Sequence, residues 1–181
     1  RFGQQPTTIL IAGLTKTGKT TIAYALERQL FDQGRAVCVL DGQNMRLGIS
    51  KDLGFSADDR SENLRRSFEV ARLMNDVGLI CICAFLAPGE EIRRRIREEV
   101  GPDRFFEIYL SAPIDVCRQR DFTGMYTRAD SGEIESFPGV SAPYEEPKSP
   151  DLTLRTDELS VEECVDRIVL LLKTRGMISL P

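Results

Sequence analysis

The stretch GLTKTGKTT, residues 13–21, follows directly on the apolar run TILIA, residues 8–12, and it constrains the fold more than any other feature. Its spacing fits G-x-x-x-x-G-K-[ST], in which the backbone curls so that several N–H groups point into one concavity. The helix that follows adds positive potential at its N-terminus. Residues 21–30 carry apolar side chains at helical spacing, so both flanks supply the required context. We therefore predict a site for a nucleoside triphosphate.

Roles within this phosphate loop follow from side-chain chemistry. Lys19 reaches the outer phosphates as a point charge, and Thr20 offers its hydroxyl to Mg²⁺. Lys16 is uncommon at a place where small residues are usual, and two alternatives stay open for it: a charge near the phosphates or a side chain in solvent. The candidate ATP-binding residues are Gly13, Leu14, Thr15, Lys16, Thr17, Gly18, Lys19, Thr20 and Thr21.

The chain has 181 residues, 41% of them hydrophobic, which suffices for one compact domain over residues 1–181. A formal net charge of −4 argues against nucleic acid as the main partner. No apolar run is long enough to span a bilayer and no signal-peptide pattern is present, so we expect no membrane partner. The sequence opens on Arg1 rather than methionine, and we expect an excised part of a longer polypeptide.

The chain has five cysteines and no histidines. Cys81 and Cys83 sit two apart in the run LICICAF, so on a strand both face the same side. A metal site without histidine would rest on Cys, Asp or Glu alone, and we favour buried reduced thiols and a cytoplasmic compartment. Any general base must then be a carboxylate, another non-imidazole side chain or water.

Apolar strand-like runs alternate with helical patterns along the chain. Strands are expected at 8–12, 36–40, 79–85, 105–110 and 152–154, and helices at 21–30, 62–76, 90–99, 114–120 and 161–173. This alternation predicts an α/β fold of the phosphate-loop NTPase type, a parallel sheet with helices on both faces. The pattern stops over residues 121–150, a stretch rich in Gly, Pro and Ser. We interpret it as a lid loop over the substrate rather than a passive surface loop.

The ends of the expected strands carry the residues that suggest a reaction, because ligands of such folds bind at the carboxyl ends of the strands. The second strand ends in DGQNMR, residues 41–46, and the third in FLAP, residues 85–88. No carboxylate stands at the end of the third strand, where many phosphate-loop enzymes keep an Asp for Mg²⁺. Asp41 is therefore the candidate to orient a metal-bound water or to accept a proton from a hydroxyl. The structural alternative is that Asp41 begins a turn with Gly42.

An arginine cluster follows, and its guanidinium groups suit a second anionic ligand. For Arg46 and Arg60, which flank the turn at Gly54 and Phe55, we favour binding. For Arg65 we favour an ion pair on a solvated helix face. Phe55 either stacks on a base or caps the core, and the sequence leaves both open.

Three long motifs then give a specific resemblance. DGQN-x-R, KDLGFS-x-x-DR-x-EN-x-RR and GEI-x-x-F-x-GV-x-x-PYE-x-P, in this order, closely resemble the adenylylsulfate kinase family over nearly the whole chain. The resemblance implies an enzyme that uses ATP and Mg²⁺ to phosphorylate the 3′-hydroxyl of adenosine 5′-phosphosulfate (APS). The products would be ADP and 3′-phosphoadenosine 5′-phosphosulfate (PAPS), in sulfate assimilation. A homodimer, or a part of a bifunctional sulfurylase–kinase assembly, is the implied partner state.

The resemblance also implies roles for matching residues. Lys19 and Asp41 would be catalytic, Thr20 and Asp41 would hold the metal, and Arg120 would pack against the ATP adenine. Phe55 and Phe137 would sandwich the APS adenine once the lid closes. Because Phe137 lies in a Gly- and Pro-rich loop, we expect its removal to leave thermal stability almost unchanged. The implied APS-binding set is Arg46, Phe55, Arg60, Asn63, Leu86, Ala87 and Phe137.

Three positions depart from the family pattern. Gln43 replaces a second Asp, Ala87 replaces a Ser, and Thr123 replaces a Lys. Ala87 excludes a phosphoserine intermediate at that position, so direct in-line transfer is the expected mechanism. The departures keep an alternative open, a catalytically silent PAPS-sensing domain of the kind found in some fungal ATP sulfurylases. The intact Gly18-Lys19-Thr20 and Asp41 favour the active kinase, and the long substrate-side motifs disfavour a kinase for another small hydroxyl compound.

Overall fold

A computed structural model describes residues 3–179 of the chain. Within them, one parallel sheet has the strand order β2-β3-β1-β4-β5. Its strands are β1 Thr7–Ala12, β2 Val37–Asp41, β3 Ile80–Ala84, β4 Phe105–Ser111 and β5 Leu152–Arg155. The predicted α/β fold is confirmed, strand for strand. Arg1, on which the expectation of a longer polypeptide rested, lies outside the described residues.

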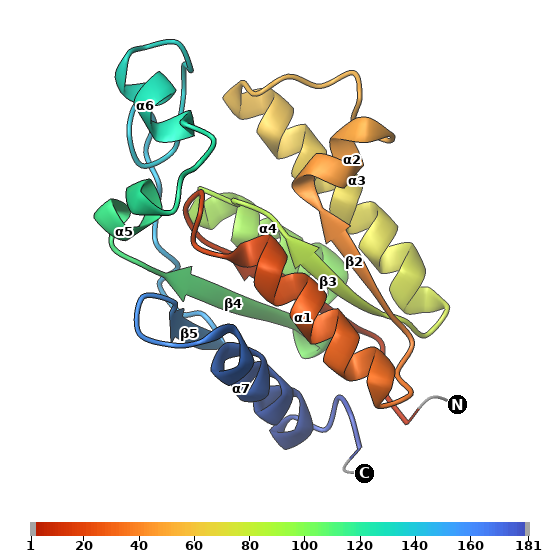
Figure 1. Ribbon diagram of the computed structural model, residues 1–181. Helices are drawn as coiled ribbons and strands as arrows, with labels where there is room; N and C mark the ends of the chain where they lie inside the picture. Colours follow the sequence, from red (N-terminus) through yellow and green to blue (C-terminus); the bar gives the residue numbers. More distant parts are fainter. Residues whose placement is uncertain (1–2, 180–181) are drawn as a thin grey trace.

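Helices cover both faces of the sheet (Figure 1). Alternate residues of β1 point to opposite faces: Ile9 and Ile11 pack with α1 and α7, whereas Leu10 and Ala12 pack with α3 and α4. Burial on both faces explains why the strands are continuous apolar runs without alternation. The helices are α1 Lys19–Asp32, α2 Gly42–Leu47, α3 Ala57–Asp76, α4 Glu90–Val100, η1 Pro102–Arg104, α5 Ile114–Gln119, α6 Met125–Asp130 and α7 Val161–Thr174.

The predicted lid, residues 121–150, is more ordered than its composition suggests. It contains the helix α6, which the sequence did not predict. A small apolar cluster holds it together, made of the buried Cys117, Tyr126, Ala129 and Phe137, and Leu14 of the phosphate loop packs against this cluster. The lid therefore has a core of its own that rests on the phosphate loop. In Figure 1 it rises at the upper left, and the start of α3 rises opposite it.

The cysteines have no disulfide partners. Cys81 and Cys83 are buried free thiols on the same face of β3, as predicted. None of the helices within residues 3–179 combines the length and the apolar character needed to cross a membrane.

Candidate active site

The phosphate loop lies between β1 and α1, and its backbone requires its glycines. A Cβ added to Gly13 would lie 2.6 Å from the carbonyl oxygen of Leu110 in β4. Gly18 has φ +99 and stands at the N-cap of α1, a left-handed conformation that glycine adopts without strain. The loop thus brings its N–H groups and the N-terminus of α1 to one place, which favours a bound polyphosphate.

Lys19 is the first residue of α1, and its ammonium contacts the backbone of the phosphate loop. Its Nζ donates to the carbonyl oxygens of Gly13 at 2.9 Å and Leu14 at 2.7 Å. Loss of water around the ammonium lowers the pKa of Lys19 from 10.5 to about 8, and the nearby Cys117 and Asp41 offset only part of that effect. Lys19 is therefore held where an incoming phosphate can take over its hydrogen bonds.

We expect nucleotide binding to take up protons near pH 8. With a pKa of about 8, Lys19 is charged in about half of the empty molecules at that pH. A bound triphosphate favours the charged form, so binding at pH 8 should take up roughly 0.5 proton, falling toward zero at pH 6. Titration calorimetry with a non-hydrolysable ATP analogue, in two buffers of different ionisation enthalpy, measures this uptake. The Lys19→Met variant should lose it, and equal uptake in both proteins would assign the proton to another group.

Asp41 ends β2 and faces the phosphate loop. Its Oδ2 accepts a hydrogen bond from the Thr20 hydroxyl at 2.7 Å, and its Oδ1 accepts from the Gln43 N–H at 2.8 Å. The structural alternative for Asp41 is therefore confirmed in the form of a cap on helix α2, and its functional role stays a prediction, which its second oxygen beside the phosphate loop permits. A hydroxyl and a carboxylate are the hard oxygen donors that Mg²⁺ prefers, so these two residues fit that ion.

A second group of cations lies around Phe55. The guanidinium of Arg46 lies 4.4 Å from the centre of the Phe55 ring, and that of Arg60 lies 5.8 Å from it. Burial lowers the pKa of both guanidiniums, and for Arg60 the charge of Arg46 adds to this. Within residues 3–179 no carboxylate lies within ion-pair distance of either one. Two neighbouring cations with no carboxylate in direct contact, and only the more distant charge of Asp59 acting on Arg46, favour an anionic ligand.

The other arginines of this segment are paired instead. Arg65 Nε lies 2.7 Å from a Glu62 oxygen, so the predicted ion pair is confirmed. Arg66 pairs with Glu62 and with Asp52. The contrast separates the two candidate ligand-binding arginines from those that only stabilise the surface of α3.

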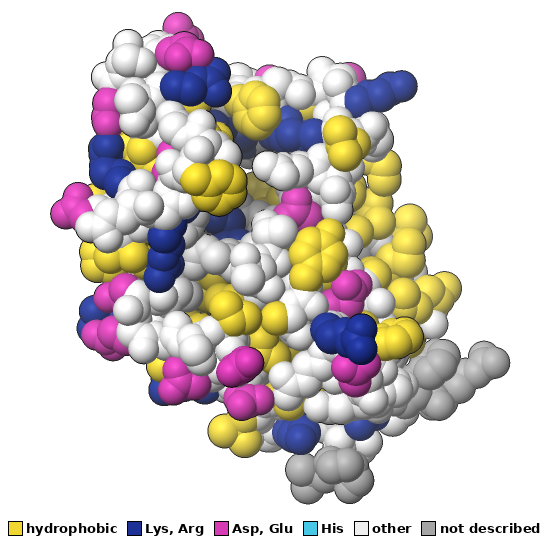
Figure 2. Space-filling model, viewed as in Figure 1, with side chains coloured by type: hydrophobic (Ala, Val, Ile, Leu, Met, Phe, Trp, Pro, Cys, Tyr) yellow, Lys and Arg dark blue, Asp and Glu magenta, His cyan; other side chains and the backbone are white. Residues whose placement is uncertain are grey.

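A cleft of about 660 Å³ lies next to Arg60, between α3, the turn after β3 and the lid. Its wall includes Leu64 of α3, Pro88 of the turn, and Ser136 and Pro138 of the lid. Figure 2 shows this side of the molecule hollowed between its upper left and upper right parts, with Lys and Arg side chains in the hollow and at its rim. Asn63 on α3, a predicted APS contact, is 4% exposed and is not among the residues that line this cleft, and within residues 3–179 its Oδ1 has no hydrogen-bond partner.

Phe55 and Phe137, the two rings expected to sandwich the APS adenine, differ in exposure in this structure. Phe55 is 62% exposed and accessible to a base. Phe137 is 2% exposed, and its ring packs edge-on against Tyr126 with centroids 5.1 Å apart. The premise that Phe137 lies in a loop outside any core is wrong, because the lid has a core of which Phe137 is part.

Phe137→Ala should therefore lower the melting temperature. Truncation of a buried Phe in a full core costs about 3–5 kcal/mol, and the small lid cluster places this variant at the lower end. Thermal unfolding followed by circular dichroism measures the loss. Phe55→Ala serves as the matched control and should leave the melting temperature almost unchanged, because its ring is mostly in solvent. An equal loss in both variants would contradict the lid core.

The remaining candidates lie at the edges of the site. Arg120 is the C-cap of α5 and donates to the hydroxyl and the carbonyl oxygen of Thr156. Ala87, in the turn after β3, is 1% exposed and has φ +43, and Leu86 beside it is half-buried. Of the two alternatives for Lys16, a side chain in open solvent is wrong, since its ammonium lies 3.4 Å from Asp121 of the lid and the side chain is only 19% exposed, whereas a charge near the phosphates stays a prediction.

Sequence reasoning missed the residues that hold the turn after β3 to the lid. Arg93 of α4 is 1% exposed and donates to the carbonyl oxygens of Ala87 at 2.6 Å and Glu145 at 2.8 Å. Its Nε lies 2.9 Å from Glu107 Oε1, close enough for an ion pair although not aligned for a hydrogen bond. Glu145 in turn accepts from the Glu90 N–H at the start of α4. No pattern in the sequence marks Arg93, because the run IRRRIR reads as a solvated helix face.

The family model and the two related proteins described next are similar to this chain over most of its length. The family model described as Adenylylsulphate kinase matches residues 5–155. A bifunctional enzyme of Rhodopirellula baltica is 52% identical over 98% of this chain, and the chain spans 28% of that enzyme's length. The adenylyl-sulfate kinase of Halothermothrix orenii is 43% identical, with 98% of this chain and 95% of the relative covered.

Solved structures of two APS kinases superpose on this chain. The Mycobacterium tuberculosis APS kinase in complex with AMPPNP and APS superposes with a TM-score of 0.88 at 38% identity, over 94% of this chain and 99% of that one. The hexameric APS kinase from Thiobacillus denitrificans superposes with a TM-score of 0.74 at 33% identity, over 99% of this chain and 31% of that one. The chain belongs to the adenylylsulfate kinase family.

Proposed function

We propose that the protein is an adenylylsulfate kinase, which transfers the γ-phosphoryl group of ATP to the 3′-hydroxyl of APS and forms PAPS and ADP. The observation that carries the proposal is the combination of a complete phosphate loop with a second anion site at Arg46 and Arg60. The relative from Mycobacterium tuberculosis was solved with the ATP analogue AMPPNP and APS together, which supports the proposal that this chain also has one site for a nucleoside triphosphate and one for APS. The family match over residues 5–155 supports the same reaction.

Each residue has a part in this reaction that its chemistry permits. Lys19 exchanges its carbonyl partners for the β- and γ-phosphates and stabilises the charge of the transferring group. Thr20 and Asp41 would hold Mg²⁺, which would add further neutralisation of that charge when bound. Asp41 also orients the 3′-hydroxyl and accepts its proton, since the chain has no histidine to do so. Ala87 has no hydroxyl, so transfer runs directly between the substrates.

The lid completes the site by excluding water. Hydrolysis of ATP competes with transfer to a hydroxyl wherever water reaches the γ-phosphate. Arg60 Nη2 donates to the carbonyl oxygen of Ser136 at 3.2 Å, so α3 and the lid already touch across the cleft. APS bound between them would then hold its 3′-hydroxyl in line with the γ-phosphate.

A coupled assay of ADP release, with and without APS, tests the proposed function. We expect release that requires APS, and formation of PAPS in equal amount. Release at the same rate without APS would contradict a kinase with this substrate. Binding of PAPS without any turnover would instead favour the silent sensing domain.

Gln43→Asp separates these two functions further. The Gln43 side chain is exposed, and only its backbone N–H contacts Asp41. Restoring the family's carboxylate should therefore leave turnover within about tenfold, which is roughly 1.4 kcal/mol in activation free energy. Steady-state rates of the two proteins measure the difference. A silent parent protein that gains turnover with this substitution would overturn the proposal.

The assembly, the metal ion and the cellular location of the kinase are further proposals. We infer that the domain works either as a homodimer or joined to a sulfurylase, and 52% identity with the Rhodopirellula bifunctional enzyme supports the second arrangement. Use of Mg²⁺ rests on the Thr20–Asp41 pair, and a cytoplasmic location rests on the free thiols. Size-exclusion chromatography with light scattering measures the assembly of this chain.

A further inference from the structure

Lys16 joins the phosphate loop to the lid. It stands in the loop with φ +68, and its Nζ lies 3.4 Å from Asp121 Oδ1 and 4.5 Å from the centre of the Phe122 ring. The Lys16 side chain is 19% exposed and that of Asp121 is 2% exposed, whereas Phe122 is 92% exposed. A partly buried ion pair between two segments that are about 100 residues apart is stronger than one in open solvent.

Asp121 carries a permanent negative charge at the edge of the nucleotide site. Its Oδ1 accepts from the Thr123 hydroxyl at 2.6 Å, and its Oδ2 accepts from the Tyr126 N–H at 2.8 Å. Burial opposes the charged form, but these hydrogen bonds and Lys16 outweigh it and lower the pKa of Asp121 to about 2. The lid therefore holds a carboxylate in its charged form 3.4 Å from Lys16 of the phosphate loop.

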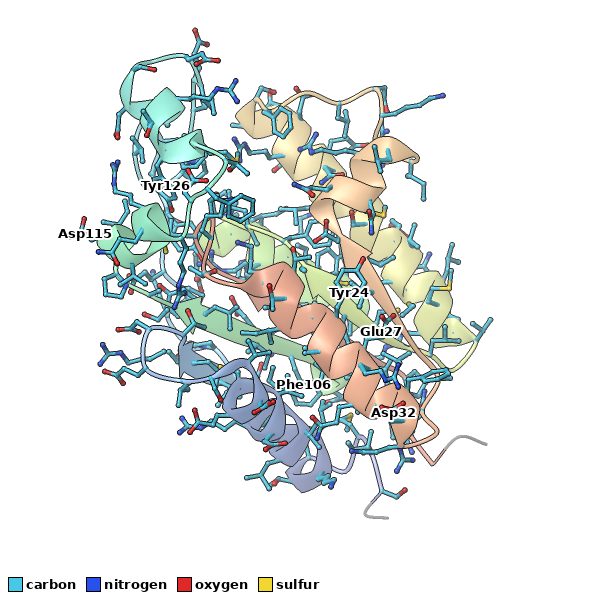
Figure 3. All side chains as sticks on the ribbon, viewed as in Figure 1. Tyr24, Glu27, Asp32, Phe106, Asp115 and Tyr126 are labelled. Atoms are coloured by element: carbon cyan, nitrogen blue, oxygen red, sulfur yellow. The ribbon has the colours of Figure 1, made fainter. Side chains whose placement is uncertain are left out.

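A second contact runs parallel to this ion pair. The hydroxyl of Tyr126 donates to the carbonyl oxygen of Thr15 at 2.8 Å, and the Tyr126 ring packs against Phe137. Tyr126 comes from α6 and is labelled in Figure 3, above the start of α1. Thr15 and Lys16 of the loop thus contact Asp121 and Tyr126 of the lid. From Tyr126 the contacts continue to Phe137, next to the cleft that takes the second substrate.

We propose that Lys16 is a positioning residue that bridges the nucleotide phosphates to the lid. When a nucleotide occupies the phosphate loop, the Lys16 ammonium stays between the phosphates and the Asp121 carboxylate. Its positive charge attracts both and offsets their mutual repulsion. Nucleotide binding then keeps the lid in contact with the phosphate loop and raises the affinity of the second site for APS. Without this ammonium, the phosphates and Asp121 repel, and the lid is pushed away from the loop. The inference rests on the proposed function for the identity of the two substrates.

A tryptophan reporter measures the response of the lid directly. The chain contains no Trp, so Phe122→Trp introduces a single fluorophore that keeps an aromatic ring under the Lys16 ammonium. We expect a saturable change in its fluorescence when the non-hydrolysable ATP analogue AMPPNP is added with Mg²⁺. Adding Lys16→Met, which keeps the apolar stem and removes the charge, should reduce that change by at least half.

Kinetics test the effect on the second substrate. Lys16→Met should raise the KM for APS by about fivefold, the lower end of usual coupling between sites, and leave kcat within about threefold. Lys16→Arg should stay close to the parent protein. Asp121→Asn added to Lys16→Met should restore at least half of the loss, because the carboxylate that needed shielding is gone. Lys173→Met in α7, the same chemical change far from the site, is the matched control and should change nothing.

The outcomes separate the possible explanations. A rise in the KM for ATP alone, with no rescue by Asp121→Asn, would reduce Lys16 to a phosphate contact and overturn the bridge. A lower melting temperature, with equal losses for both substrates and no fluorescence difference, would make the ion pair merely structural and overturn it as well. A parent protein without APS-dependent turnover would contradict the proposed function, and the reporter would still test the bridge.

Discussion

Lys19→Ala should lower turnover by about 10²-fold or more and leave the fold intact. The side chain contacts the carbonyl oxygens of Gly13 and Leu14 rather than the apolar core, so its removal deletes no core packing. What it deletes is a cation at the outer phosphates, where charge develops during transfer. One donor that stabilises such charge is worth about 10²–10³-fold in kcat. ADP release in the presence of APS measures the loss, and Lys173→Ala in α7 is the matched control.

The fold of the Lys19→Ala variant can be checked through the pH dependence of its stability. Because the folded protein lowers the pKa of Lys19 to about 8 from 10.5, the unfolded chain binds more protons between these two values. The free energy of unfolding of the parent protein therefore rises with pH through this window, and the cost of the buried charge is present in full below pH 8. The alanine variant should lack this rise. Normal turnover in a folded variant would remove Lys19 from the reaction.

The strands and the long helices could be predicted from the sequence because each shows a local pattern of apolar residues. All the expected strands and the long helices agree with the structure apart from their ends. The start of α3 was placed five residues late, since Ser56 caps the helix through the Asp59 N–H and the first turn, Ala57–Arg60, is too polar to show the apolar period. The helices α2 and α6 were missed because they are short, with six residues each, and lie in polar or Gly-containing segments with too few apolar side chains to show a helical period, unlike the equally short α5.

Candidate site residues could be predicted from the sequence where a local motif determines how the backbone folds. Contacts between segments that are distant in the sequence could not be predicted. Lys19, Thr20 and Asp41 converge as their positions at the ends of β1 and β2 require. The burial of Phe137 could not be read from a Gly- and Pro-rich stretch, because its partners are Tyr126 in the lid and Leu14 in the phosphate loop. Arg93 is similar, since its contacts with Ala87 and Glu145 depend on how the lid returns along α4. The pairing of Lys16 with Asp121 likewise depends on tertiary structure alone.

Asp41→Asn should lower kcat by about 10²-fold with little loss of stability, and the reason lies in the two oxygens of the side chain. Asp41 Oδ1 accepts from the Gln43 N–H and caps α2, and Asn is as good a cap as Asp, so the fold keeps this contact. Asp41 Oδ2 faces the Thr20 hydroxyl at 2.7 Å, and there the substitution removes the negative charge. The charge is needed to accept a proton from the 3′-hydroxyl, a contribution of about 10²–10⁴-fold, and to attract the metal.

The comparison with Asp41→Ala makes this test specific. Alanine removes both the charge and the cap, so it should lower kcat as much as asparagine does and cost about 1 kcal/mol more in the free energy of unfolding. Thr20→Val removes the hydroxyl that donates to Oδ2 and should raise the Mg²⁺ concentration needed for half-maximal rate. Rates measured over a range of Mg²⁺ then separate the two roles of the carboxylate. If excess Mg²⁺ restores the full rate of Asp41→Asn, the side chain serves the metal alone, and the proton of the 3′-hydroxyl must leave to water or to the phosphate itself.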